Sequence, residues 1–309
     1  MKRIGWLLSF CAVLLIALFV NGLFFMSGLG SKSPISTPAP FSEKEPNKQT
    51  EQLSGHIESS ASKEMPANLM VLGLDRDKTR CDVIMLFHFV PSTSSLSLIS
   101  VARDTRVLAN GVYTRINTLY SKGGEKMVAE ELTKITGLPV HYYVTIDFKG
   151  FREIIDTLDG VEFDVPFRMN YDDPTQNLHI HLRKGLQVLN GKKAEQLVRY
   201  RKGNYKGQGY TEGDLGRINM QQDFMKQLIK QKMNPRYLSR SQKIFDILRQ
   251  YVKTNIALVD ITQYMGSVVK IKDDEIEAFT IPGTSSMIRG KWYFIYDRDK
   301  TAEMMKEHF

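Results

Sequence analysis

The pattern of apolar and polar positions divides the chain into three parts. Ile4 to Met26 contains no charged residue, and about 20 helical residues are enough to cross the hydrocarbon core of a bilayer. The next stretch, Ser27 to about Pro66, is rich in Ser, Pro, Glu and Lys and has few large apolar residues. The pattern therefore predicts a transmembrane signal-anchor over residues 4–26 and a disordered linker over residues 27–66.

The third part, residues 67–309, alternates short apolar runs with segments of helical spacing. The runs that predict buried strands are NLMVLGL, DVIMLFHFV, SLSLISV, VHYYVTI, VEFDV and, near the C-terminus, IEAFTI and KWYFIY. Helical spacing extends over residues 124–136, 147–158, 190–201, 214–233, 242–252 and 261–269. This alternation predicts one domain with an α/β layered fold, in which helices cover a mostly buried sheet.

Polar side chains stand where several predicted helices begin. Asp147 and Asn190 each precede a helix and can accept a hydrogen bond from its first turn. Asp214 precedes the next amphipathic run in the same way, which places Arg217 in the first turn of that helix. The helix dipole disfavours a positive charge there, so Arg217 is a modest indication of function.

The N-terminal residues indicate how the chain is oriented. Lys2 and Arg3 precede the apolar run and favour a cytoplasmic location for residues 1–3, with the rest of the chain outside the membrane. A cleaved signal peptide is the alternative, because the small residues of MSGLGS resemble a cleavage site.

Composition and charge narrow the class of protein only a little. A hydrophobic content of 42% and a charged content of 25% are those of an ordinary globular protein. The net charge of +8 favours an acidic partner, and nucleic acid, anionic lipid head groups and phosphorylated glycans all qualify. Cys81 is the only cysteine outside the apolar run, so we interpret it as a small packing residue.

Common catalytic motifs are absent from the sequence. It contains no GxxxxGK[ST], HExxH or GxSxG, and its six histidines form no obvious ligand cluster. His88 lies in an apolar run and is interpreted as a core or edge residue. His179 and His181 alternate along an extended segment, a spacing that by itself gives a zinc site little support.

Two carboxylates flank neighbouring apolar runs. Asp75 comes just after the first run and Asp82 opens the second, so both reach one edge of the sheet if the two strands are neighbours. Such a pair suits Mg²⁺, which prefers oxygen ligands and keeps several waters. On spacing alone, turn capping by both aspartates is the simpler interpretation, with Arg76 and Arg80 as solvated neighbours.

Arginines form the second group of candidates. Arg103 and Asp104 follow the third apolar run, and ligands of α/β sheets gather beyond the carboxyl ends of strands. This placement brings Arg103 toward Asp75, although a surface Arg–Asp pair of little energetic value is an equally good interpretation. Arg115, which precedes a helical stretch, has a structural role when it is considered in isolation.

The stretch LVRYRKGNYKGQGYTEGDLGR places further arginines around a glycine-rich loop. Arg199 and Arg201 are two residues apart and share no helix face, but both reach one pocket if the helix ends there. A guanidinium group grips phosphate oxygens in pairs. The loop between Gly203 and Gly213 holds four glycines, so we expect it to be mobile.

Several of these segments together resemble a known family. Residues 68–233 contain, in collinear order, NLMVLGLD…RCD, SLSLISVARDT, RIN, HYYVTIDFKGFREIIDTLDGVEFDV, HLRKGLQVLNGKKAEQLVRYRK and GDLGRINMQQDF. In this order they strongly resemble the LytR-CpsA-Psr family. Ala102 stands where the family often has proline. Met220 stands where the family often has a basic residue, so this chain lacks one positive charge expected beside the main cluster.

The resemblance implies a fold and an activity. The family fold is a mixed central β-sheet flanked by helices, with an apolar pocket for a lipid tail, here as a single extracytoplasmic catalytic domain behind a transmembrane helix. Such enzymes of Gram-positive cell membranes transfer a glycopolymer from a polyprenyl-pyrophosphate carrier to peptidoglycan. They form a phosphodiester, commonly to the muramic acid 6-hydroxyl, and wall teichoic acid and capsular or secondary wall polysaccharide are the usual polymers. Nucleic acid is not an expected partner, because only residues 1–3 would face the cytoplasm.

The resemblance also implies roles for individual residues. The aspartates that bind Mg²⁺, or Mn²⁺ in its place, align with Asp75 and Asp82. The arginines that bind pyrophosphate align with Arg103, Arg115, Arg199, Arg201 and Arg217. The residues expected to take part in catalysis are Arg103, Asp82 and Asp104, with Arg80 and Asp214 as supporting neighbours.

The chemistry of phosphoryl transfer agrees with this assignment. It needs positioning and charge neutralisation more than a protein nucleophile, and Asp82 or Asp104 is the candidate general base. We expect Arg199 and Arg201 to hold the pyrophosphate from one side and Arg217 from the other, with the glycine-rich loop as a flap. The alternatives are a pyrophosphatase or lipid-phosphate binder and a membrane-bound transcriptional attenuator.

Overall fold

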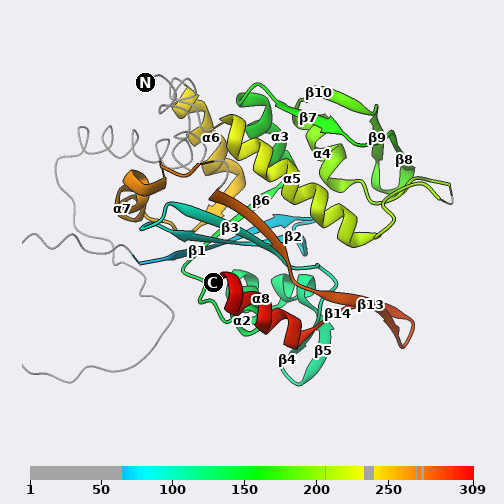
Figure 1. The fold of residues 1–309 in the computed structure, drawn as a ribbon. Helices are drawn as coiled ribbons and strands as arrows, with labels where there is room; N and C mark the ends of the chain where they lie inside the picture. Colours follow the sequence, from blue (N-terminus) through cyan, green and yellow to red (C-terminus); the bar gives the residue numbers. More distant parts are fainter. Residues whose placement is uncertain (1–64, 206, 233–239, 269, 273–274) are drawn as a thin grey trace, which may run out of the picture.

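The computed structural model describes residues 65–205, 207–232, 240–268, 270–272 and 275–309 (Figure 1). The predicted cytoplasmic tail, transmembrane segment and nearly all of the predicted linker lie outside these residues. Within the described ranges, no helix combines the length and the apolar character needed to cross a membrane.

A mixed sheet of six strands forms the centre of the structure. In spatial order the strands are β11 (Val252–Thr254), β6 (Tyr142–Asp147), β1 (Ala67–Leu74), β2 (Cys81–Val90), β3 (Ser95–Ser100) and β12 (Ile276–Thr280). β2 runs antiparallel to β1 and β3, whereas β6 is parallel to β1 and β12 is parallel to β3. The expected mixed sheet is therefore confirmed.

Helices cover both faces of this sheet (Figure 1). One face carries α2 (Leu119–Thr136) and α8 (Arg298–His308). On the other side lie α3 (Phe148–Thr157), α4 (Gly191–Arg199), α5 (Asp214–Lys232), α6 (Ser241–Tyr251) and α7 (Leu258–Val268). Met70 and Leu72 of β1 pack toward the first side, and Met85 and Leu98 pack toward the second, so the sheet is apolar on both faces.

The helix predicted over residues 124–136 begins earlier, at Leu119, and is bent. Gly124 has φ 60° and ψ −150° inside this helix, a conformation that residues with a β-carbon rarely adopt. Gly137, with φ 75°, ends the helix as predicted. The bend at Gly123 and Gly124 explains why the sequence predicted the helix only from residue 124 onward.

Two predicted helix caps are confirmed. Oδ1 of Asp147 accepts a hydrogen bond from N of Gly150 (2.8 Å) at the start of α3, and Oδ1 of Asn190 accepts one from N of Lys193 (3.0 Å) at the start of α4. At α5 the structure differs from the prediction, because Asp214 is the first helical residue and its carboxylate pairs with arginines.

Two interpretations of buried side chains are also confirmed. Cys81 is fully buried under the α2 side of the sheet, and burial, together with the charge of Asp75, raises the pKa of its thiol. His88 is buried, with Nδ1 2.6 Å from Oδ1 of Asn68. Both residues therefore belong to the core.

Several short elements were not predicted from the sequence. They include the hairpin β4–β5 (Arg106–Ala109 and Val112–Arg115) and β8 (Met169–Asp173), which pairs with β9 (Leu178–Leu182), the extended segment that carries His179 and His181. They also include β10 (Gly185–Leu189), which pairs with the predicted β7 (Val161–Val165), β13 (Gly283–Ile288), which pairs with the predicted β14 (Lys291–Tyr296), and β11 and α8. These elements are short or largely exposed, so they contain no apolar run that would reveal them.

Replacing the α4 cap tests this local structure. Asn190→Ala removes the acceptor that bonds the amide of Lys193, and we expect the free energy of unfolding to fall by about 1 kcal/mol. Urea unfolding followed by circular dichroism measures the change. Asn190→Ser is the matched control and should resemble the wild type, because serine caps helices nearly as well. An equal loss in both variants would contradict the capping role.

Candidate active site

A polar cavity lies where the ends of three adjacent strands meet. β1 and β3 end, and β2 begins, at the same edge of the sheet, because β2 is antiparallel to both neighbours. A cavity of about 500 Å³ lies at this edge. Its lining residues are Asp75, Arg76, Asp77, Arg80, Asp82, Arg103, Asp104, Arg115, Asn117, Arg199, Arg201, Gly290, Lys291 and Trp292. The strand ends therefore deliver Asp75 and Arg103 to one place.

Asp75 closes the turn between β1 and β2. Its Oδ1 accepts hydrogen bonds from the backbone amides of Thr79 (2.8 Å) and Arg80 (3.1 Å), and its Oδ2 accepts one from Nε of Arg80 (3.1 Å). Burial raises the pKa of this carboxyl, but these hydrogen bonds outweigh burial and hold the pKa below its ordinary value. Turn capping is thus confirmed for Asp75, which also lines the cavity.

Arg103 is the centre of the charged cluster. Its Nη1 lies 2.5 Å from Oδ1 of Asp82, and its Nε lies 3.9 Å from Oδ2 of Asp104. The other oxygen of Asp104 lies 3.4 Å from Nη1 of Arg115. Burial lowers the pKa of Arg103, but nearby carboxylates, chiefly Asp82, raise it more. The Arg103 and Asp104 side chains are only 23% and 22% exposed, so an exposed surface pair is the wrong interpretation.

The end of α4 directs two arginines into the cavity. Arg199 is the last helical residue and Tyr200 is extended (φ −63°, ψ 131°), so Arg199 and Arg201 both line the cavity. Nη1 of Arg199 lies 2.8 Å from Oε1 of Glu195, whose Oε2 lies 2.5 Å from Nη1 of Arg152. This network, which the sequence did not reveal, fixes the direction of Arg199.

Arg217 occupies a more buried position, with 6% of its surface exposed. Its Nη2 lies 2.8 Å from Oδ1 of Asp214, and Nε of Arg201 lies 3.4 Å from the same oxygen. Burial, and then the charge of Arg103, lowers the pKa of Arg217 to about 10. The guanidinium group therefore remains protonated at neutral pH, and Asp214 ties it to Arg201.

A second cavity, of about 240 Å³, adjoins the first and includes Arg217 in its lining. The residues that line both cavities are Asp82, Arg103, Arg199 and Arg201. A third, apolar cavity of about 70 Å³ lies between the sheet and helices α3 and α5. The residues shared by the second and third cavities are Val83, Phe148, Val198 and Gln221. The charged surface thus passes directly into an apolar one.

Two buried guanidinium nitrogens, Nε of Arg103 and Nε of Arg217, have no hydrogen-bond partner among the described residues. A buried donor without a partner is unfavourable. Both arginines line the second cavity, so their positive charge favours an anion there. Phosphate oxygens suit this role because they accept charge-assisted hydrogen bonds from arginine.

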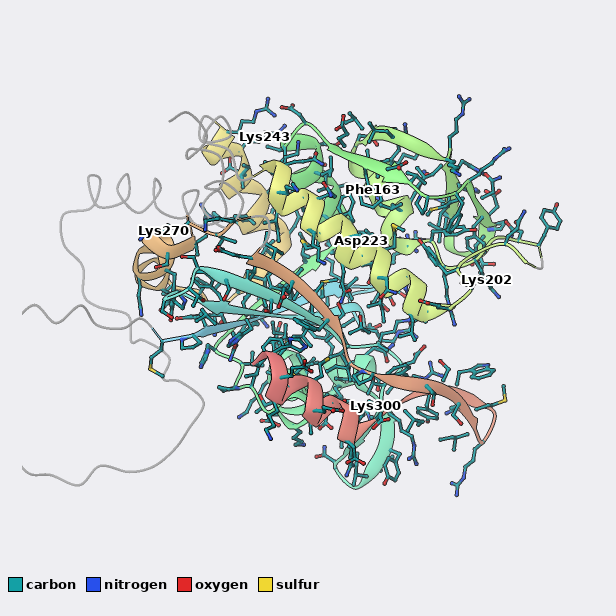
Figure 2. The ribbon with its side chains drawn as sticks, viewed as in Figure 1. Phe163, Lys202, Asp223, Lys243, Lys270 and Lys300 are labelled. Atoms are coloured by element: carbon teal, nitrogen blue, oxygen red, sulfur yellow. The ribbon has the colours of Figure 1, made fainter. Side chains whose placement is uncertain are left out.

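The glycine-rich loop borders these cavities. Lys202, labelled in Figure 2, lines the second cavity. N of Gly203 donates a hydrogen bond to O of Gln208 (3.1 Å), and the ring of Tyr210 packs edge-on against Tyr200. These contacts anchor the base of the loop, and its role as a flap stays a prediction.

The cavity contains carboxylate oxygens, which are the type of ligand that a magnesium ion prefers. Asp75 and Asp82 offer carboxylate oxygens from adjacent strands, and Mg²⁺ is commonly held by one or two carboxylates while it keeps several waters. Oδ1 of Asp82 is paired with Arg103, which leaves the second oxygen of the same carboxylate as the candidate ligand atom. The metal role of the two aspartates stays a prediction.

Some lining residues were not sequence candidates. They are Asp77, Asn117, Gly290, Lys291 and Trp292. The last three come from the β13–β14 hairpin, which reaches the cavity because N of Phe294 donates a hydrogen bond to O of Asp104 (2.9 Å). This contact joins segments that are far apart in the sequence, so no local pattern places the hairpin beside the cavity. Among these lining residues, only Asn117 lies in a motif that the sequence analysis quoted, RIN.

The sequence matches a family model along most of its length. The LytR_cpsA_psr family model covers residues 36–309. This chain belongs to the LytR-CpsA-Psr family. The match confirms the resemblance and begins within the stretch predicted to be a linker.

Relatives of known name support the same family. The chain is 27% identical over 259 residues to the polyisoprenyl-teichoic acid–peptidoglycan teichoic acid transferase TagU of Bacillus subtilis (strain 168), an alignment that covers 81% of this chain and 79% of TagU. It is 32% identical over 221 residues to the regulatory protein MsrR of Staphylococcus aureus (strain Mu50 / ATCC 700699), covering 70% of this chain and 64% of MsrR.

Solved structures show the same fold. The crystal structure of B. subtilis TagV matches with a TM-score of 0.64 at 26% identity, covering 79% of this chain and 96% of that chain. TagT bound to LIIa-WTA reaches a TM-score of 0.61 at 21% identity, covering 82% of this chain and 92% of that chain. The mixed sheet flanked by helices is therefore common to the family members compared.

The lowered pKa of Asp75 predicts a pH-dependent contribution to stability. A carboxyl whose pKa is lower in the folded than in the unfolded state stabilises the fold above its unfolded value, about 3.9. That stability is lost as the pH falls through the folded value. We expect Asp75→Asn to lower the free energy of unfolding at pH 7 by about 1–3 kcal/mol, with a difference from wild type that shrinks below about pH 4.

Urea unfolding of the two proteins between pH 7 and pH 3 measures this dependence. Asp77→Asn is the matched control, because Asp77 is exposed in the same turn and exposed charges contribute little. A difference between Asp75→Asn and wild type that stays constant across this range would rule out the carboxylate charge as its cause.

Proposed function

We propose that this protein is a phosphotransferase that moves a glycopolymer from a polyprenyl-pyrophosphate carrier to the muramic acid 6-hydroxyl of peptidoglycan. The observation that carries the proposal is the continuity between the charged and apolar cavities. Arg103 and Arg217 line the second cavity with positive charge, and Val83 and Phe148 begin an apolar surface beside them. A lipid-linked pyrophosphate likewise joins a negatively charged group, which suits the arginines, to an apolar tail, which suits the apolar surface.

The arginines act by neutralising charge. A pyrophosphate diester is negative, and the departing lipid phosphate gains negative charge as the bond to it breaks. Fixed positive groups where charge develops lower the barrier electrostatically. Arg103 and Arg217 suit this role because their carboxylate partners hold them in place before substrate binds.

The reaction needs no protein nucleophile. The acceptor hydroxyl oxygen bonds to the phosphorus that carries the glycopolymer, the bond from that phosphorus to the bridging oxygen breaks, and polyprenyl monophosphate leaves. Asp82 or Asp104 takes the hydroxyl proton, since both line the cavity and contact Arg103. Mg²⁺, when bound by Asp75 and Asp82, supplies further charge neutralisation at the phosphates.

The apolar cavity is the proposed entrance for the lipid tail. At about 70 Å³ it is far smaller than a polyprenyl chain, so the tail must separate α5 from the sheet to enter fully. Phe224 and Met225 of α5 line this cavity, and methionine adapts its shape readily. We place the protein in the cell membrane, anchored through residues 4–26, with this domain outside.

The names of the relatives indicate which polymer to test first. TagU is named as a teichoic acid transferase, so wall teichoic acid is the first donor polymer to try, and capsular polysaccharide is the second. MsrR is named as a regulatory protein, and the alternative that is not an enzyme is a membrane-bound transcriptional attenuator. A pyrophosphatase that uses the same arginines is the alternative of the same class.

Replacing Arg103 tests the proposed transfer. We expect Arg103→Ala to lower kcat at least about 100-fold, because removing one preorganised donor from a developing negative charge typically costs that much. The assay supplies lipid-linked teichoic acid and peptidoglycan and measures polymer attachment and released polyprenyl monophosphate. Arg183→Ala, at an exposed site, is the matched control, and its unchanged rate shows that loss of positive charge alone is harmless.

Two outcomes would contradict the proposal. Release of polyprenyl monophosphate without an acceptor, at the same rate as with one, would identify a pyrophosphatase. Full transfer by Arg103→Ala would show that Arg103 is not needed for the reaction. Because this variant leaves Asp82 without its partner, urea unfolding must confirm that it is folded, and Arg103→Lys keeps the charge as a second test.

Metal dependence tests the two aspartates. A chelator should abolish transfer and added Mg²⁺ should restore it, and Asp82→Asn should raise the Mg²⁺ concentration for half-maximal rate at least about tenfold. Asp164→Asn, at an exposed position of β7, should leave that concentration unchanged. If transfer proceeds fully in the chelator, no divalent ion is needed and the metal role of Asp82 is wrong.

A further inference from the structure

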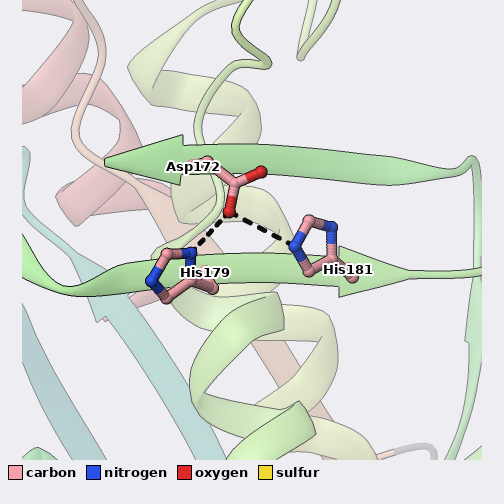
Figure 3. Close-up of side chains that lie close together, drawn as sticks. All are labelled: Asp172, His179 and His181. Atoms are coloured by element: carbon pink, nitrogen blue, oxygen red, sulfur yellow. Dashed lines mark hydrogen bonds and ion pairs between the residues drawn. The ribbon is translucent and has the colours of Figure 1, made fainter. Parts of the chain in front are cut away.

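The β8–β9 hairpin carries three side chains with metal-binding atoms on its outer face. Figure 3 shows Asp172 of β8 facing His179 and His181 of β9. Oδ1 of Asp172 lies 2.6 Å from Nδ1 of His179 and 3.3 Å from Nε2 of His181. One ligand atom from each residue lies within 4.8 Å of the others. Among the described residues this is the one such group of three.

The strand pattern explains why the three side chains meet. Successive residues of a strand point to opposite faces, so His179 and His181 lie on one face. Ile180 between them is fully buried, which places the two histidines on the outside. Asp172 is directly opposite His179 in the register of the hairpin. Side chains opposite each other across a strand pair are close neighbours.

The two distances from Asp172 are close to those of a tetrahedral metal site, and the third, between the two histidines, is at most 4.8 Å. Zinc binds imidazole nitrogen and carboxylate oxygen at about 2.0–2.2 Å, which places two ligand atoms of a tetrahedron about 3.3 Å apart. The separation of Asp172 and His181 is already 3.3 Å. The shorter contact of Asp172 and His179 must lengthen by less than about 1 Å to reach this spacing. These side chains are about half exposed, so small rotations suffice.

We propose that the β8–β9 hairpin binds one zinc-like divalent transition-metal ion through Nδ1 of His179, Nε2 of His181 and Oδ1 of Asp172, with a fourth position left to water. Imidazole nitrogens favour Zn²⁺ over Mg²⁺, which prefers an all-oxygen set. This separates the site from the aspartates of the polar cavity. The spacing of the histidines gave the sequence little basis for such a site, because Asp172 joins them only in the folded hairpin.

The hairpin that would hold the ion also contacts the glycine-rich loop and the second cavity. N of Asp172 donates to Oδ1 of Asn204 (2.7 Å), and Nδ2 of Asn204 donates to O of Asp172 (2.8 Å), which ties the hairpin to the glycine-rich loop. On the opposite face of the hairpin, Tyr171 and Leu178 line the second cavity. An ion that fixes the register of β8 and β9 therefore also fixes one wall of that cavity and the start of the loop.

Zinc binding to the full-length protein in detergent tests the proposal directly. The protein is purified without a polyhistidine tag, stripped with a chelator, and titrated with Zn²⁺ alone by calorimetry. We expect one ion per chain. Losing even an outer partner of a metal ligand costs about 10–100-fold in affinity, so His179→Ala and His181→Ala should each weaken binding at least that much. His308→Ala, an exposed histidine on α8, is the matched control.

A second measurement follows the structural effect of the ion. Hydrogen exchange of the β8 and β9 amides, and of the backbone around Asn204, should slow with Zn²⁺ in the wild type and not in the His179→Ala/His181→Ala double variant. Binding that survives in the double variant, or the absence of stoichiometric binding to the wild type, overturns the proposal. A tenfold excess of Mg²⁺ that displaces the zinc overturns it as well. Neither measurement depends on transferase activity, so failure here is distinguishable from failure of the proposed function.

Discussion

The burial of arginine at one edge of the central sheet is the constraint on which the candidate site depends. Arg103 and Arg217 are largely withdrawn from water, and a buried charge is tolerated only when it is paired. Asp82, Asp104 and Asp214 supply that pairing. Removing Arg103 takes away the ion-pair partner of Asp82, and removing Asp214 takes away that of Arg217, so the arginines and carboxylates depend on one another.

Strand order and helix packing hold this unit in place. The antiparallel register of β2 sets Asp82 beside the end of β3, where Arg103 follows. Helix α5 begins at Asp214 against the same edge, and Nε2 of Gln222 donates to O of Phe279 (2.7 Å), which ties the helix to β12. The same helix covers the apolar cavity farther along the sheet. One packing arrangement therefore creates both the charged and the apolar part of the site.

The hairpins show how distant segments complete the site. Trp292 reaches the polar cavity on β14, and Tyr171 reaches the adjoining cavity on β8. The apolar run KWYFIY predicted β14 but not its place beside the cavity, and β8 contains no such run. Motif resemblance pointed to the arginines and aspartates, which lie at strand and helix ends. It did not point to side chains such as Glu195, which orients Arg199.

The sequence by itself determined the local features of this protein. Apolar runs predicted β1, β2 and β3, side-chain capping predicted the starts of α3 and α4, and collinear motifs indicated the family. Only the tertiary structure decided that Arg103 is buried against Asp82, that Arg217 lines the second cavity, and that Asp172 meets His179 across a hairpin. Local features depend on neighbours in the chain. The rest depends on strand register and helix packing, which join residues far apart in sequence and which no single segment encodes.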